Sequence, residues 1–139
     1  MNSMSVEFID TNILVYAHDC NAVRKRGPAA DLLSRLFRER SGALSTQVFV
    51  EFYAAATRKL GLTSEQAEGV VRDLGQWMIH RPTHADLLNS IRLQRRHKLS
   101  WWDAMILNSA IETGAGTLWS EDMNNGQNYG RLVVRNPFT

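Results

Sequence analysis

The sequence predicts an α/β fold in which a mainly parallel sheet lies between two layers of helices. Short apolar runs alternate with longer segments of helical character through all 139 residues. We expect about five strands: Val6 to Ile9, Ala43 to Ser45, Met78 to His80, Thr117 to Trp119 and Leu132 to Val134. A helix between two strands returns the chain to the same end of the sheet, so such strands run parallel. We therefore predict a three-layer α/β/α sandwich. No repeat, linker or low-complexity tract interrupts it, so we expect one domain over residues 1–139.

Proline, glycine and capping residues mark the helix boundaries. A short helical segment follows the first strand and begins at Asn12. Gly27-Pro28 places proline in the first turn of a helix predicted from Pro28 to Arg40, and Gly42 is expected to stop that helix.

Two capping boxes predict where later helices begin. Thr63-Ser64-Glu65-Gln66 opens a helix that we expect to reach Trp77, and Thr83-His84-Ala85-Asp86 opens one that reaches Lys98. A last helix is expected from Ser100 to Thr113. Glycine ends a helix because it readily adopts a left-handed conformation, and two glycines have this expected role: Gly61 and Gly114.

Composition excludes several classes of protein. Hydrophobic residues make up 44% of the chain, and no apolar stretch approaches the roughly 20 residues of a membrane helix. The amino terminus carries Glu7 and Asp10 where a secretory signal would be basic and then apolar. We therefore expect a soluble cytoplasmic protein. Cys20 is the only cysteine, and without ligand-spaced neighbours it can form neither an internal disulfide nor a zinc site.

Four acidic residues stand at the edges of strongly apolar segments, where a carboxylate is costly unless it is paired or bound to a metal. They are Asp10, Glu51, Asp103 and Asp122. Asp10 and Asp122 follow strands, whereas Glu51 and Asp103 lie in the early turns of helices. The ligand crevice of an open parallel sheet lies outside the carboxyl ends of its strands. We therefore expect all four side chains to reach one edge of the sheet.

A shared divalent cation is the natural partner for such a cluster. Like charges a few Å apart raise one another's pKa unless a cation neutralises them. Oxygen ligands without cysteine or histidine select Mg²⁺ or Mn²⁺ over Zn²⁺. The four histidines show no ligand spacing, and we expect surface or capping roles for them: His18, His80, His84 and His97.

Each acid also has a simpler interpretation, which the sequence leaves open. Asp10 can cap the short helix that follows it, and Asp103 fits a capping-box pattern. Glu51 can form a buried ion pair with an arginine, and Asp122 can be a turn residue. The joint pattern is more specific than any one position.

Two other classes of site that use a strand-end aspartate fit poorly. A phosphatase with an aspartyl nucleophile needs a second aspartate two residues after the first, and Asn12 stands there. A receiver domain needs a lysine late in the chain, but the last lysine is Lys98.

Four segments together resemble a PIN-domain nuclease. They are Phe8-Ile9-Asp10-Thr11-Asn12-Ile13-Leu14-Val15-Tyr16, the helix with Glu51, Ser100-Trp101-Trp102-Asp103-Ala104, and Leu118-Trp119-Ser120-Glu121-Asp122-Met123 followed by Gly126. The resemblance spans the chain, whose size also resembles the VapC-like toxins of type II toxin-antitoxin pairs. It implies that Asp10, Glu51, Asp103 and Asp122 occupy the acidic catalytic and metal-site positions. It implies supporting roles for Thr11, Asn12 and Ser120, with serine in place of the frequent threonine. Glu121 is also placed among the supporting residues, and the sequence leaves open whether it shares the metal-site role of Asp122.

The resemblance also implies an activity and partners. The implied activity is endonucleolytic cleavage of RNA that depends on Mg²⁺ or Mn²⁺ and leaves 5′-phosphate and 3′-hydroxyl ends. The implied partners are a cognate antitoxin protein and a second copy of the chain in a homodimer. The alternative is a non-catalytic PIN-like module that binds RNA or a protein.

Basic residues offer two possible RNA contacts, although the net charge of +2 does not by itself indicate a nucleic-acid binder. Arg24, Lys25 and Arg26 are the better candidates because they should lie near Asp10. The second cluster lies at a helix end, where cations complement the macrodipole: Arg92, Arg95, Arg96 and Lys98. Trp101 and Trp102 are expected to fill the core rather than stack on bases.

Overall fold

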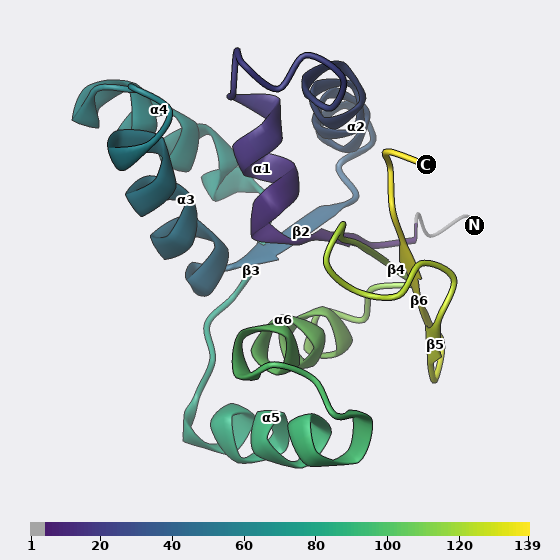
Figure 1. Cartoon of the computed structure of the whole chain (residues 1–139). Helices are drawn as coiled ribbons and strands as arrows, with labels where there is room; N and C mark the ends of the chain where they lie inside the picture. The colour runs from purple at the N-terminus through teal and green to yellow at the C-terminus, as the bar shows by residue number, and fades with distance from the viewer. Residues whose placement is uncertain (1–4) are drawn as a thin grey trace.

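A computed structural model describes residues 5–139 (Figure 1), and residues 1–4 of the predicted domain lie outside it. The elements follow one another in the order β1 (Glu7–Ile9), α1 (Thr11–Ala17), α2 (Arg26–Glu39), β2 (Gly42–Ser45), α3 (Thr46–Arg58), α4 (Ser64–Asp73), η1 (Leu74–Gln76), β3 (Met78–His80), α5 (His84–His97), α6 (Trp101–Glu112), β4 (Thr117–Trp119), β5 (Asn128–Tyr129) and β6 (Leu132–Arg135).

The strands form one sheet in the order β3-β2-β1-β4-β6-β5. Every neighbouring pair is parallel except β5 and β6, which pair antiparallel. All five predicted strands are therefore confirmed to within a residue or two. The sixth, β5, has two residues and is too short to produce an alternating apolar pattern.

Helices cover both faces of the sheet, as the predicted three-layer architecture requires. In Figure 1, α1, α2, α3 and α4 lie on one side of the strands, and α5 and α6 lie on the other. The central strands supply fully buried side chains, among them Phe8, Leu44 and Leu118. Leu14 of α1 and Leu107 of α6 are also fully buried and belong to the same hydrophobic cluster.

Both predicted capping boxes are present. Thr63 and Gln66 exchange hydrogen bonds at the start of α4, and Thr83 and Asp86 do so at the start of α5. The helix expected to reach Trp77 instead ends at Asp73 and continues as a single 3-10 turn. Two expected terminators, Gly61 and Gly114, have positive φ angles of 74°, the conformation in which glycine ends a helix.

Gly42 does not have the role that the sequence predicts. The preceding helix is ended by Arg40, which is left-handed with φ of 55°. Gly42 is instead the first residue of β2, and a Cβ atom there would lie 2.5 Å from Cε3 of Trp77. The absence of a side chain at Gly42 lets the buried indole ring pack directly on the strand.

Within residues 5–139, no helix combines the length and the apolar character needed to cross a lipid bilayer.

Candidate metal centre

The carboxyl ends of β1 and β4 bring together two segments separated by more than a hundred residues. These strands are neighbours, and Ile9 lies opposite Trp119. The pairing continues one step further, because the Asp10 amide donates a 2.9 Å hydrogen bond to the Trp119 carbonyl. Asp10 and Ser120 therefore leave the sheet side by side, at the edge where parallel sheets bind ligands.

Both carboxylate oxygens of Asp10 accept hydrogen bonds. The Thr11 amide donates to Oδ1 at 2.7 Å, so Asp10 does cap α1. The Ser120 hydroxyl donates to Oδ2, also at 2.7 Å. The pKa of Asp10 is raised from 3.8 to about 7, mainly by burial. The hydrogen bonds from Ser120 and Thr11 oppose this rise, and the nearby Asp122 and Asp103 carboxylates add to it.

Asp10, Asp103 and Asp122 form a compact acidic cluster. Each contributes an oxygen, and the three oxygens lie within 4.8 Å of one another. Burial raises the pKa of Asp103, as do the Asp122 and Glu51 charges, while its contact with Ser100 lowers it. No lysine, arginine or histidine among residues 5–139 forms an ion pair with these three carboxylates. The donors are all hard oxygens, which suits Mg²⁺ or Mn²⁺.

Asp103 contributes to this cluster while its helix is capped by another residue. Its amide donates a 3.1 Å hydrogen bond to the Ser100 hydroxyl, which is the N-cap of α6. The cap at the start of α6 is thus formed by the Ser100 hydroxyl and the Asp103 backbone amide. The Asp103 carboxylate lies with those of Asp10 and Asp122.

Glu51 lies next to this cluster but is not one of its three members. The Thr11 hydroxyl donates to Oε1 at 2.5 Å, and the Gln47 side-chain amide donates to Oε2 at 3.3 Å. The arginine ion pair considered for Glu51 is not formed within residues 5–139. Gln47 was not predicted, although its position one helical turn before Glu51 could have indicated the contact.

Polar contacts fix the loop after β4. The Asn12 side-chain amide donates to Oδ2 of Asp122 at 3.0 Å, and the Asp122 amide donates to the Ser120 hydroxyl at 3.1 Å. The Ser120 hydroxyl thus accepts a hydrogen bond from the Asp122 amide and donates one to the Asp10 carboxylate. Thr11, Asn12 and Ser120, the predicted supporting residues, all contact a predicted acidic residue.

The Glu121 carboxylate is engaged away from the acidic cluster. It accepts a 2.8 Å hydrogen bond from the Tyr16 hydroxyl and forms an ion pair with Lys25. Although burial raises the pKa of Glu121, its contacts with Lys25 and Tyr16 bring it below its usual value. Tyr16 is 105 positions away in sequence, and no local pattern could have predicted this contact.

The predicted basic contacts have different surroundings. Lys25 forms an ion pair with Glu121, whereas Arg24 and Arg26 are exposed. The second cluster lies at the end of α5, where Arg95 and Arg96 occupy the last turn.

The expectation that Trp102 fills the core is wrong, because 59% of its surface is exposed at the first turn of α6.

Comparisons with solved structures reveal the same fold in proteins of low sequence identity. A toxin-antitoxin complex from Klebsiella pneumoniae gives a TM-score of 0.69 at 21% identity, covering 94% of this chain and 97% of the matched one. VapBC2 from Rickettsia felis, bound to a DNA fragment from its promoter, gives 0.68 at 19% identity, covering 94% and 98%. VapC20 of Mycobacterium tuberculosis, a toxin that cleaves the sarcin-ricin loop, gives 0.66 at 19% identity, covering 84% and 91%.

No curated protein sequence shows significant similarity to the chain. The PIN domain family model, however, matches residues 8–125, which include all four predicted acidic residues and most of the loop after β4. With this match, the chain belongs to the PIN-domain family.

Proposed function

We propose that this protein is a metal-dependent endoribonuclease and the toxin of a toxin-antitoxin pair. The observation that carries the proposal is the convergence of Asp10, Asp103 and Asp122 at the carboxyl edge of the sheet in a PIN domain. The sheet combines strands from Glu7 to Arg135, which supports one nuclease domain over the whole chain.

Asp10, Asp103 and Asp122 are the residues that would hold Mg²⁺ or Mn²⁺. Such an ion, when bound, supplies a Lewis acid for phosphodiester hydrolysis and makes water a stronger nucleophile. Ser120 and Asn12 hold the Asp10 and Asp122 carboxylates in place through hydrogen bonds. Contacts of this kind keep ligands in the orientation that an ion requires.

Glu51 is proposed as the fourth catalytic acid. Its carboxylate is held by Thr11 and Gln47 beside the three-carboxylate cluster and is close enough to raise the pKa of Asp103. Held in this way, it can accept a proton or a hydrogen bond from water at the edge of the crevice. Glu121 is proposed to act indirectly, by anchoring the loop that carries Asp122.

RNA is the proposed substrate, and Arg24 and Arg26 are the proposed phosphate contacts because both are exposed close to the anchored Lys25. The solved structures with this fold include toxin-antitoxin complexes and a toxin that cleaves the sarcin-ricin loop. By analogy, we propose that the chain works in the cytoplasm, that an antitoxin protein neutralises it, and that it forms a homodimer.

Cleavage of a panel of structured RNAs, with Mn²⁺ or with a chelator, tests the proposed activity. The wild type should cleave only with the metal, and Asp10→Asn should lose cleavage by a factor of about 10² or more. Asp31→Asn is the matched control, because Asp31 is exposed on α2 outside the acidic cluster. It should retain wild-type cleavage.

Calorimetric titration with Mn²⁺ distinguishes the enzyme from the non-catalytic alternative. The proposal requires Mn²⁺ binding that Asp10→Asn weakens. A wild-type chain that binds RNA but neither binds Mn²⁺ nor cleaves would be a binding module.

A further inference from the structure

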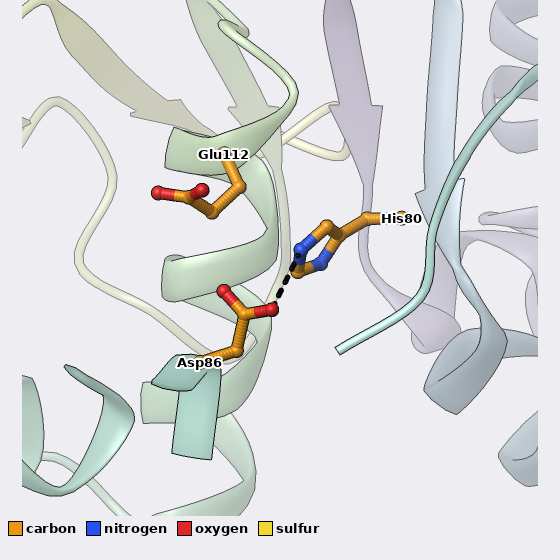
Figure 2. A group of neighbouring side chains, drawn as sticks. All are labelled: His80, Asp86 and Glu112. Atoms are coloured by element: carbon orange, nitrogen blue, oxygen red, sulfur yellow. Dashed lines mark ion pairs between the residues drawn. The ribbon is translucent and has the colours of Figure 1, made fainter. Parts of the chain in front are cut away.

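We propose that His80, Asp86 and Glu112 form a second metal site, which takes a zinc-class ion. The three side chains come from the end of β3, the start of α5 and the end of α6 (Figure 2). Each offers one ligand atom, and the three atoms lie within 4.8 Å of one another. No two of these residues have a ligand spacing in sequence, so only folding brings them together.

The separation of His80 from Asp86 suits two ligands of one ion. Nε2 of His80 lies 3.3 Å from Oδ2 of Asp86, the pair joined by the dashed line in Figure 2. A charge-assisted hydrogen bond is usually shorter, about 2.7 to 2.9 Å. Two ligands of a tetrahedral zinc ion with bonds of about 2.1 Å are separated by about 3.4 Å. The observed distance is therefore long for a charge-assisted hydrogen bond and close to the separation of two ligands that share one metal ion.

The other ring nitrogen of His80 is held in the way that metal-binding histidines usually are. Nδ1 lies 2.8 Å from the hydroxyl of Ser109, a fully buried residue of α6. When Nδ1–H donates to this hydroxyl, the lone pair of Nε2 faces the carboxylate of Asp86. In that tautomer a bound cation would relieve the repulsion between the lone pair and the carboxylate, and such outer contacts commonly orient zinc-binding imidazoles.

Asp86 is a fixed and ionised ligand. Its Oδ2 accepts a 2.7 Å hydrogen bond from the Thr83 amide, and its Oδ1 accepts one of 3.1 Å from Asn108. The Thr83 amide in particular lowers the pKa of Asp86, although burial opposes this, and contacts with Asn108 and the Thr83 hydroxyl lower it further. The carboxylate is therefore charged and correctly placed without reorganisation.

Glu112 supplies the third ligand from the surface. It lies in the last turn of α6 and is exposed, and within residues 5–139 no basic side chain forms an ion pair with it. Its flexible side chain can close the remaining gap to the ion, and solvent can complete the coordination. One nitrogen and two oxygen donors suit zinc better than magnesium.

This site is separate from the acidic cluster. Asp103 lies in the first turn of α6 and Glu112 at the end of the same helix. Nine residues of α-helix separate them by about 14 Å. An ion at His80, Asp86 and Glu112 would link β3 to α5 and α6. It would stabilise the packing of these two helices on the sheet whether or not the chain cleaves RNA.

Zinc titration of Glu112→Gln tests the proposal. The substitution removes one ligand at an exposed position and should leave the fold intact. Competition with a chromophoric zinc chelator should show at least tenfold weaker binding of one equivalent in this variant than in the wild type. Glu65→Gln, the same change at an exposed position on α4, should bind zinc like the wild type.

The imidazole signals of His80 in NMR spectra give an independent readout. Zinc should shift these signals in the wild type and in Asp10→Asn, where the acidic cluster is altered, but not in Glu112→Gln at the same zinc concentration. The proposal is overturned if zinc leaves the His80 signals of the wild type unchanged. It is equally overturned if Glu112→Gln binds as many equivalents as the wild type with the same affinity.

Discussion

The hydroxyl of Ser120 donates a 2.7 Å hydrogen bond to the carboxylate of Asp10, joining residues 110 positions apart. The same oxygen accepts the amide of Asp122 at 3.1 Å. One buried serine therefore links two acidic residues of the candidate metal centre, which follow the neighbouring strands β1 and β4.

Ser120→Ala should weaken Mn²⁺ binding by about 10- to 100-fold, since loss of a residue that orients metal ligands commonly has an effect of that size. Alanine leaves one oxygen of the buried Asp10 without its donor. Ser120→Thr keeps the hydroxyl and should bind Mn²⁺ nearly as well as the wild type. Calorimetry on the three proteins measures the difference, and equal affinities for alanine and threonine would contradict the role given to the hydroxyl.

Asp10→Asn should make the metal-free protein more stable at alkaline pH. The pKa of Asp10 is about 7 in the folded protein against an ordinary value of 3.8. Because the folded pKa is raised, the neutral carboxyl group stabilises the folded protein. This stabilisation is fully present below pH 3.8 and is lost as the pH rises through 7. At pH 8 the variant should gain on the order of 4 kcal/mol, because the folded and ordinary pKa values differ by roughly three units and each unit corresponds to about 1.4 kcal/mol.

Chemical denaturation in a chelator at pH 8 and at pH 4 measures this gain, which should disappear at the lower pH. Asp31→Asn is again the control. A variant of Asp10 that is less stable than the wild type at pH 8 would show that its carboxylate is not strained in the absence of a metal.

Glu7→Gln should destabilise the fold in a manner that depends on pH. Arg35 donates two hydrogen bonds to Glu7, at 2.9 and 2.8 Å, and Trp119 donates a third at 2.8 Å. The Arg35 contact lowers the pKa of Glu7, although burial opposes it, and Trp119 contributes to the lowering. The stabilisation is therefore present above pH 4.5 and is lost as the pH falls through the lower folded pKa.

Urea denaturation at pH 7 should show a loss of about 1 to 3 kcal/mol for this variant. The difference from the wild type should shrink towards pH 3. A loss of equal size at both values would assign the effect to packing and not to charge.

Lys25→Ala and Arg24→Ala should affect different steps of RNA cleavage. Lys25 pairs with Glu121 beside Asp122, so its loss should weaken Mn²⁺ binding and lower kcat. Arg24 is exposed, so its loss should raise KM for RNA and reduce the dependence of KM on salt. Kinetics at several salt concentrations separate the two effects. If Lys25→Ala changes only KM, this lysine contacts RNA and does not position the loop.

Gly42→Ala should destabilise the protein by about 1 to 3 kcal/mol, the usual cost of overpacking a core. The new methyl group would lie 2.5 Å from Cε3 of the buried Trp77. Gly69→Ala in α4 is the matched control, because no atom lies within 4 Å of a Cβ there and alanine favours helix. It should be neutral or stabilising. Thermal unfolding of both variants measures the contrast, and a stable Gly42→Ala would mean that Trp77 can move aside.

The sequence by itself determined the layers of this fold and most of its elements. Apolar runs predicted the parallel strands, and the capping boxes at Thr63 and Thr83 predicted where two helices begin, because such signals are local. It also identified Asp10, Asp103 and Asp122 as the residues to consider, since carboxylates beside apolar segments are costly without a partner. The interpretation of Trp102 as core failed because the face of a helix that is buried depends on what packs against it.

Only the tertiary structure decided how those residues are used. The pairing of β1 with β4 set Ser120 against Asp10, and the packing of α1 on the loop after β4 directed Glu121 to Tyr16 and Lys25. It likewise assembled His80, Asp86 and Glu112 from three elements. A side-chain cluster depends on distances between segments far apart in the chain, and local propensities carry no information about such distances.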